Sequence, residues 1–163
     1  PTFPNAVITP LRANLQRQTL NPIAGSGGNR NSTGNSVNFA TQKGWYIDMP
    51  DTGERINTSP ALGAGALVFT SNVPSSDLCA LGGHSFFNVV DYQTGGKRTG
   101  DPAIPSSLRV SNAHLSSPVL ARIQSGMVVG IVQTSNASIL VNPAAGAGGG
   151  GATKRRSWRE LLQ

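Results

Sequence analysis

The chain has 163 residues, of which 37% are hydrophobic and 12% charged, and its formal net charge is +6. Typical globular domains have about 45–50% apolar and about 25% charged residues, and here 20 Gly and 11 Pro make up much of the difference. This composition excludes a helical bundle or coiled coil, and the sparse charge argues against intrinsic disorder of the charged kind.

The predicted elements are short strands separated by turns. After a Pro-rich start, residues 24–36 (AGSGGNRNSTGNS) predict a flexible loop. Residues 97–107 predict a second loop, residues 143–153 a Gly-rich linker, and residues 156–163 a terminal segment that docks back onto the fold. The strand candidates between them are 37–42, 45–49, 66–71, 85–90, 119–123, 127–133 and 138–141.

Strands of about 5–7 residues that recur every 8–15 residues, roughly, indicate an all-β sandwich, barrel or propeller. The apolar runs 66–71 and 85–90 are continuous rather than alternating. Such runs are typical of a sheet packed between other sheets, as in a propeller blade. No apolar run approaches the roughly 18–20 residues of a membrane helix, so we expect no membrane span.

Three acids lie close together at Asp48, Asp51 and Glu54. They form a candidate carboxylate cluster for a cation or for acid–base chemistry, although their spacing does not match an EF-hand loop. Asp followed by Thr and Gly is also typical of a turn, in which Asp bonds the local backbone and Gly adopts a positive φ. We favour the turn.

Other metal or catalytic sites have weak support. His84 and His114 have no His or Cys at ligand spacing, and the single Cys79 excludes an internal disulfide and a multi-Cys zinc site. A Ser–His–Asp triad stays open because serines are abundant, but no G-x-S-x-G elbow singles out a nucleophile. We therefore predict no catalytic, cofactor-binding or metal-binding residues.

Much of the positive charge is terminal. Four of the 13 basic residues lie in the last ten positions, at Lys154, Arg155, Arg156 and Arg159. No basic run is interleaved with aromatic residues, so we do not expect nucleic-acid binding. A basic β-domain that binds nucleic acid or another anionic polymer remains an alternative function.

The block 43–96 contains an ordered set of motifs. They are Gly44-Trp45-Tyr46, Asp48-Met49-Pro50, Gly53-Glu54-Arg55, Val68-Phe69-Thr70, Pro74, Asp77, Cys79, Gly82-Gly83, and Asp91 with Thr94-Gly95-Gly96. In order and spacing this block resembles the C-terminal β-propeller domain of PilC/PilY-type type IV pilus assembly and tip-adhesin proteins. The chain end around Trp158, with Ser157 before it and Arg159-Glu160 after it, is similar to the usual end of that family.

The resemblance implies a fold, a function and a location. The fold would be all-β, with short antiparallel strands that form about two four-stranded blades of a quinoprotein-like propeller, and residues 1–163 would be its C-terminal segment. The function would be non-enzymatic, in pilus assembly and surface adhesion. The protein would reach the cell surface through the periplasm and outer membrane and act at the pilus tip. A quinoprotein-like enzyme fragment is the less favoured alternative, because fold alone does not imply that activity.

The resemblance also implies partners. These would be minor pilins at the pilus tip, the remainder of a parent chain, and a host or abiotic surface. The family's calcium loop has no counterpart in this sequence, so we expect no calcium and no other cofactor. The best candidates for contact surface are the two predicted loops, 24–36 and 97–107.

We expect the motif residues to determine the fold rather than to bind a ligand. Large amphipathic rings would anchor neighbouring strands, glycines would permit tight turns, and Glu54 and Arg55 would pair with each other or reach backbone groups. The residues in this structural group are Trp45, Tyr46, Asp48, Glu54, Arg55, Cys79, Gly82, Gly83, Asp91 and Trp158.

Overall fold

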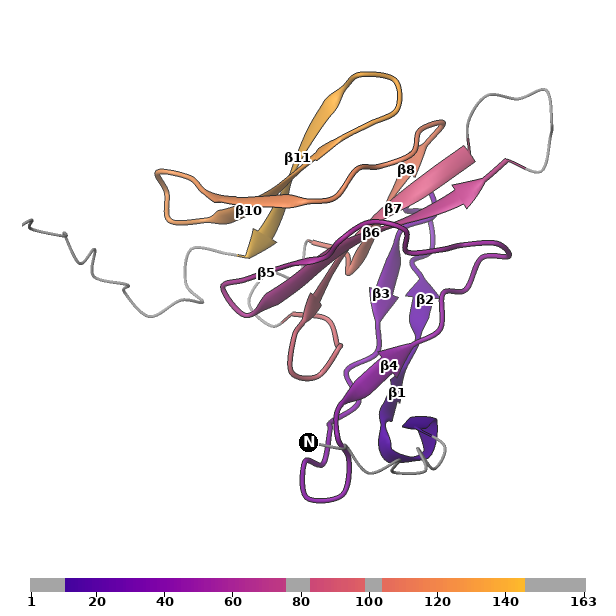
Figure 1. Cartoon of the computed structure of the whole chain (residues 1–163), viewed down its shortest axis with the longest axis vertical. Coiled ribbons are helices and arrows are strands. Elements are labelled where there is room, and N and C mark those ends of the chain that lie inside the picture. Colours follow the sequence, from indigo (N-terminus) through magenta and orange to yellow (C-terminus); the bar gives the residue numbers. More distant parts are fainter. Residues whose placement is uncertain (1–10, 76–82, 99–103, 146–163) are drawn as a thin grey trace, which may run out of the picture.

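The computed structural model describes residues 11–75, 83–98 and 104–145, and all of its sheets lie within these ranges (Figure 1). Apart from one short 3-10 helix, the elements of this part are strands. In chain order they are η1 (Leu11–Asn14), β1 (Gln16–Gln18), β2 (Leu20–Pro22), β3 (Arg30–Ser32), β4 (Trp45–Ile47), β5 (Ala61–Gly63), β6 (Ala66–Pro74), β7 (Gly83–Asp91), β8 (Ser107–Ser111), β9 (Val119–Arg122), β10 (Val128–Gln133) and β11 (Ile139–Ala145).

The largest sheet has six antiparallel strands in the order β2-β3-β8-β7-β6-β5. Its centre is the pair β6 and β7, which are hydrogen-bonded in register over nine residues each. β5 joins β6 through Ala64 and Gly65, whose φ angles of 50° and 74° are both positive. Two consecutive positive φ angles are typical of a type I′ turn, which matches the twist of a hairpin.

A three-stranded sheet in the order β11-β10-β9 packs on one face of the six-stranded sheet, and Figure 1 shows β10 and β11 as a layer beside β6 and β7. Gly130 of β10 makes the contact close, because a Cβ atom there would collide with the ring of Phe87. The buried residues of this interface are Ala66, Val68, Phe87, Val89, Leu115, Val128, Val132 and Ala144. This layer is the hydrophobic core of the described chain.

A two-stranded parallel sheet pairs β1 with β4, so that Gln16 lies opposite Trp45 and Gln18 opposite Ile47. It lies at the lower end of the molecule in Figure 1, next to η1. β1 leads directly into β2, the edge strand of the large sheet. The chain from β1 to β4 therefore leaves the small sheet, crosses into the large one and returns.

The all-β prediction is confirmed, and most strand pairs are antiparallel as expected. The described strands nevertheless form sheets of six, three and two strands instead of two four-stranded blades, and none of these sheets is closed. The large sheet exceeds four strands because the polar segments of β2 and β3 add to it through backbone pairing. No helix of the described residues is long and apolar enough to cross a membrane.

The predicted loops and linker differ from the structure at several points. Residues 30–32, inside the predicted loop 24–36, form β3, and Ser107 at the end of the predicted loop 97–107 begins β8. The predicted strand 37–42 is absent, because those residues form a turn with its own local hydrogen bonds. Residues 143–145 of the predicted linker belong to β11, where Pro143 lies opposite Val129. Residues 146–163, including the terminal docking segment, lie outside the described ranges.

Candidate functional site

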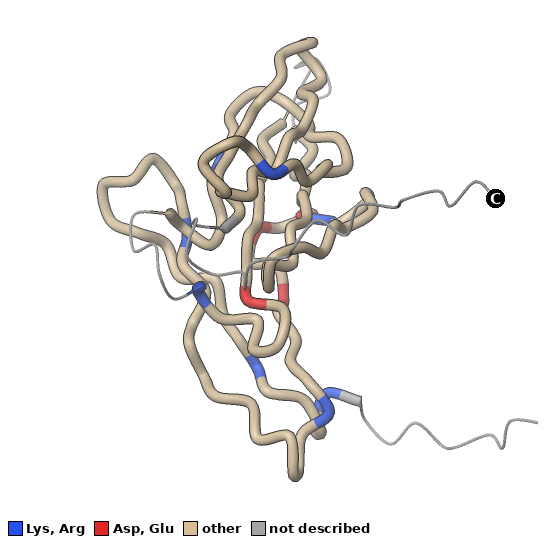
Figure 2. The backbone as a smooth tube through the Cα atoms, turned by 90° about the vertical axis from the view of Figure 1, so that its left-hand side faces the viewer, with Lys and Arg blue, Asp and Glu red and all other residues tan. Residues whose placement is uncertain are grey.

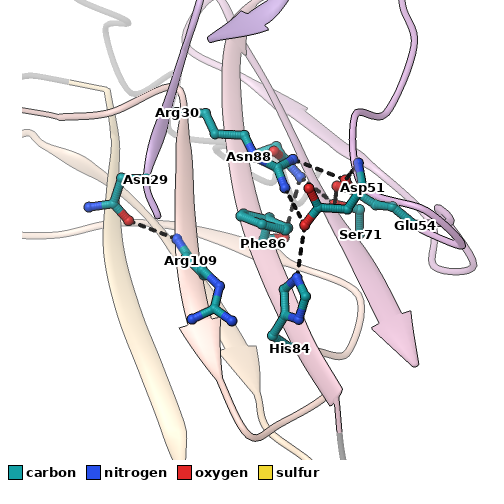
Figure 3. Close-up of polar contacts among 9 residues, drawn as sticks. All are labelled: Asn29, Arg30, Asp51, Glu54, Ser71, His84, Phe86, Asn88 and Arg109. Atoms are coloured by element: carbon teal, nitrogen blue, oxygen red, sulfur yellow. Dashed lines mark hydrogen bonds and ion pairs between the residues drawn. The ribbon is translucent and has the colours of Figure 1, made fainter. Parts of the chain in front are cut away.

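A buried ion-pair cluster lies on the other face of the large sheet, and we call it the Arg30 cluster (Arg30, Asp51, Glu54, Ser71 and His84; Figure 3). Arg30, in β3, is only 5% exposed. Its Nη2 lies 2.7 Å from Asp51 Oδ2, and its Nη1 lies 3.0 Å from Glu54 Oε2. One buried guanidinium therefore binds two carboxylates, which satisfies a charge that would otherwise be very costly to bury.

A turn brings the two carboxylates together. The backbone N–H of Glu54 donates to Asp51 O at 3.0 Å, and the Asp51 N–H donates to Glu54 Oε2 at 3.2 Å. Gly53, between them, has a φ of +78°, a conformation that side chains rarely adopt. The turn predicted from Asp, Thr and Gly therefore exists, and it presents both acids to the same arginine.

The strands β6 and β7 supply the polar side chains, Ser71 and Asn88, that lie next to Glu54. The hydroxyl of Ser71 donates to Glu54 Oε1 at 2.6 Å, and Asn88 Nδ2 donates to Ser71 Oγ at 3.1 Å. The Glu54 side chain has no exposed surface. Asn88 Oδ1 is buried and has no hydrogen-bond partner in the described structure. This end of the cluster is closed to solvent, and Asn88 supports Glu54 through the Ser71 hydroxyl.

The aromatic ring of Phe86 packs against the cluster from β7. The Arg30 guanidinium carbon lies 3.5 Å from the ring centroid, a cation–π contact, and the His84 ring meets Phe86 edge-on at 5.4 Å with an interplanar angle of 81°. His84 Nε2 lies 2.9 Å from Asp51 Oδ2. The His84 and Asp51 side chains are 24% and 37% exposed, so this end of the cluster reaches solvent.

The chemistry of the cluster is that of a cross-link between distant segments. It joins β3, the turn 51–54 and the pair β6–β7 through charged and hydrogen-bonded side chains. Ser71, the serine in the cluster, is hydrogen-bonded to Glu54 and not to His84, so these residues do not form a Ser–His–Asp relay. Across the described ranges, no group of three His, Cys, Asp or Glu side chains could hold a metal ion.

Of the three acids that are neighbours in sequence, Asp48 separates from the other two in the structure. Asp48 pairs with Arg12 at 2.7 Å, and both side chains are largely exposed at 40% and 68%. Arg55 does not pair with Glu54 but donates from its Nε to Gly53 O at 3.3 Å, and its backbone bridges to Asn72. Of the two expectations for Arg55, contact with backbone groups is the one that the structure shows. Glu54 pairs with Arg30 instead.

Trp45 and Asp91 meet at a second junction. Asp91 Oδ1 accepts the backbone N–H of Gln93 at 3.0 Å and that of Thr94 at 2.9 Å, which holds the turn after β7. Trp45 Nε1 donates to Tyr92 O at 3.0 Å, and the indole ring lies against Gly95 so closely that a Cβ atom would collide with it. This turn therefore anchors β4 to the large sheet.

The buried side chain of Gln18 hydrogen-bonds β1 to the same turn after β7. Gln18 has no exposed surface, and its Nε2 donates to Asn35 O at 2.7 Å and to Thr94 O at 2.8 Å. Its Oε1 accepts the hydroxyl of Thr33 at 2.6 Å. The side-chain amide thus replaces backbone pairing where two irregular segments meet.

The remaining motif residues have simple placements. Tyr46 lies beneath the Arg12 guanidinium, 5.1 Å from carbon to ring centroid. Gly83 begins β7 opposite Pro74, where a Cβ atom would collide with Val73 O. Cys79, Gly82 and Trp158 lie outside the described residues.

Sequence reasoning missed the two residues that organise these junctions, Arg30 and Gln18. Both lie in short polar segments without apolar periodicity, and Arg30 lies in a Gly- and Asn-rich stretch. The one available signal is that Arg30 is the only charged residue in residues 18–42. On sequence alone, His84 is considered only as a metal ligand or a triad member, and its pairing with Asp51 spans 33 residues.

The charged residues of the described chain are unevenly distributed. Figure 2 shows the acidic residues in the middle of the molecule and Lys and Arg at scattered places above and below them. Among the described basic residues, Arg12 and Arg30 are paired with acids. This scattered arrangement does not make the continuous basic stripe that nucleic-acid binding favours.

Comparison with known proteins finds one similarity. The chain is 33% identical over 76 residues to a protein of Xylella fastidiosa named type IV pilus biogenesis factor PilY1 homolog. The aligned part covers 43% of this chain and 5% of that protein, so the chain matches only a small fraction of its length. No protein-family model matches the chain. No solved structure matches it either.

Proposed function

We propose that this chain is a β-module of a type IV pilus biogenesis factor of the PilC/PilY type. The observation that carries the proposal is the 33% identity over 76 residues to the Xylella fastidiosa PilY1 homolog. The motif block 43–96 resembles the same family. The structure is all-β, which agrees with the fold class that this resemblance implies. The motifs and the alignment over 76 residues therefore favour the same family.

The finer parts of the proposal concern location, partners and mechanism. The protein acts at the cell surface, at or near the pilus tip, with minor pilins and the remainder of a longer chain as partners, and it contacts host or abiotic surfaces. Its role is non-enzymatic and needs no cofactor, and its sheets form part of a larger propeller. The Arg30 cluster supports the non-enzymatic role, because its charged groups bind one another.

The experiment is an in-frame deletion of residues 11–145 from the encoding gene in its native strain. We expect pilin sheared from the cell surface to fall strongly while total cellular pilin stays constant, and complementation with the intact gene to restore surface pilin. Unchanged surface pilin in the deletion strain would contradict a role in pilus biogenesis.

Adhesion needs a separate measurement, because cells without pili lose adhesion for trivial reasons. The same deletion is made in a strain that cannot retract its pili. In that strain pili accumulate even when a factor that opposes retraction is missing. If the chain contributes to adhesion, these piliated cells attach less than the retraction-deficient parent. Equal attachment would restrict the role to assembly.

A further inference from the structure

An aromatic groove lies at the junction of the small and large sheets, away from the Arg30 cluster. It is lined by Leu15, Phe39, Lys43, Trp45, Tyr92 and Gln93 and has a volume of about 500 Å³. These residues come from three separate segments: the start of β1, residues 39–45 and the turn after β7. The volume falls within the roughly 300–1,000 Å³ of small-molecule sites.

The walls of the groove are held in place by hydrogen bonds. Trp45 is bound to Tyr92 O and pressed against Gly95, and Gln93 Nε2 donates to the Tyr92 hydroxyl at 2.9 Å. On the opposite wall the backbone N–H of Lys43 donates to Asn14 O at 2.8 Å. The wall that Trp45 and Tyr92 form is therefore fixed before binding, and a fixed wall loses little conformational freedom on binding.

The exposed surface of the groove combines apolar and polar groups. Phe39 is 63% exposed and Tyr92 47% exposed, so two aromatic rings face solvent here. In the described structure the Lys43 ammonium forms no ion pair. Exposed rings beside convergent polar groups are typical of a binding site.

We infer that this groove binds an acidic saccharide. The C–H faces of a sugar ring pack on aromatic side chains, its hydroxyls bond the Gln93 amide, and its carboxylate pairs with Lys43. A proline-rich peptide also suits an aromatic groove, but it offers no anion for Lys43. Single-stranded nucleic acid needs a basic track along its backbone, and the groove has one basic residue.

The inference does not depend on a role in pilus assembly, because binding is measured on the purified full-length chain. A Trp158→Phe background leaves Trp45 as the single tryptophan, so its fluorescence reports on the groove. The probes are tri-galacturonic acid, a trisaccharide ending in N-acetylneuraminic acid, the neutral sugar maltotriose and decaproline.

We expect at least one acidic trisaccharide to change Trp45 emission with saturation, and maltotriose to bind at least about fivefold more weakly. Lys43→Ala should remove that preference and Lys43→Arg should retain most of it. Tyr92→Ala and Phe39→Ala should each weaken binding about tenfold, the size expected when a stacking ring is lost.

Two control variants lie outside the groove. Tyr46→Ala removes the neighbouring aromatic ring, which contacts Arg12 instead, and Arg122→Ala removes an exposed cation of β9. Neither should change the affinity for the acidic probe.

Any of four results would overturn the assignment: no binding of either acidic probe, equal affinity for maltotriose, preferential binding of decaproline, or binding that Tyr92→Ala and Phe39→Ala both leave unchanged. Pilus assembly could still depend on the protein in each case.

Discussion

At the scale of single residues, the fold depends on a few buried polar groups that connect segments with weak strand character. Arg30, Glu54 and Gln18 are each almost or fully buried, and their partners lie far away in sequence. A buried charge stabilises a structure only while its partners remain, because the loss of one leaves the other unpaired in a poorly hydrated environment. Substitutions at these positions should therefore have large effects for their size.

Glu54→Gln keeps the shape of the side chain but removes the charge that Arg30 faces at 3.0 Å. We expect a loss of about 3 kcal/mol in the free energy of unfolding, because the Arg30 guanidinium stays buried with Asp51 as its remaining carboxylate. The matched control is Asp48→Asn, whose exposed pair with Arg12 should contribute less than about 1 kcal/mol. Urea unfolding of the full chain measures both, and equal losses would contradict the assigned role of Glu54.

Gly95→Ala tests the contact between the turn after β7 and Trp45. Gly95 has a φ of +70°, and its added Cβ atom would enter the space of the indole ring. Gly126→Ala is the control, because Gly126 has a φ of +84° and no atom within 4 Å of the added Cβ. Both should lose about 1–2 kcal/mol from backbone strain, and Gly95→Ala roughly 1–3 kcal/mol more from the collision.

The readouts for this pair are urea unfolding and Trp45 emission in the Trp158→Phe background. Gly95→Ala should shift the emission of the folded protein, whereas Gly126→Ala should not. If the two variants lose the same stability and neither shifts the emission, Trp45 does not rest on Gly95.

At the scale of elements, the two antiparallel sheets are held together by an apolar layer with one close contact. Gly130 of β10 faces Phe87 of β7, and Val68 of β6 lies 3.5 Å from the place of its missing Cβ atom. The approach of the sheets at this point therefore depends on the absence of a side chain. The outer face of the three-stranded sheet β11-β10-β9 carries exposed Val119 and Val141 on either side of Ile131.

Gly130→Ala should separate the sheets or displace Phe87 from its position. We expect a loss of about 1–3 kcal/mol, the usual range for overpacking a close-packed core. Gly34→Ala is the control, since an added Cβ atom there meets nothing within 4 Å. Thermal unfolding followed by circular dichroism compares the two, and a stability for Gly130→Ala no lower than for Gly34→Ala would contradict the close contact.

Local sequence signals predicted the long apolar strands and failed for several short or polar ones. β6, β7 and β10 are runs of β-branched and aromatic residues, so their strand character is visible in the sequence. β2 and β3 are three residues each, and they form strands because Leu20 pairs with Ser32 and Arg30 with Ser107 across the fold. Such long-range backbone pairing leaves no local pattern.

The candidate site follows the same division. The turn at Asp51 and Gly53 was predictable, because turn chemistry is local. The partners of the Asp51 and Glu54 carboxylates were not predictable, because Arg30 lies 24 residues before Glu54 and His84 lies 33 residues after Asp51. The aromatic groove likewise needs three segments to meet, so the sequence shows its rings but not their proximity.

At the scale of the whole molecule, the described chain is a two-layer β-module with a small parallel sheet fastened to one end. It matches 5% of the length of the PilY1 homolog, so the activity of that whole protein comes to this chain only as a proposal. The Arg30 cluster stabilises the module, and the exposed aromatic groove gives it a surface for recognition. Stabilisation and recognition are thus assigned to different sites of the module.

The proposal that this chain works at the type IV pilus is tested most directly by the location of the native protein. Pili are sheared from the native strain and from a strain that lacks the major pilin, and an antibody against the chain is used on the sheared, periplasmic, outer-membrane and cytosolic fractions. We expect the protein to be present in the sheared fraction of the piliated strain and lost from that fraction in the strain without pilin. Detection only in the cytosol of both strains would contradict it.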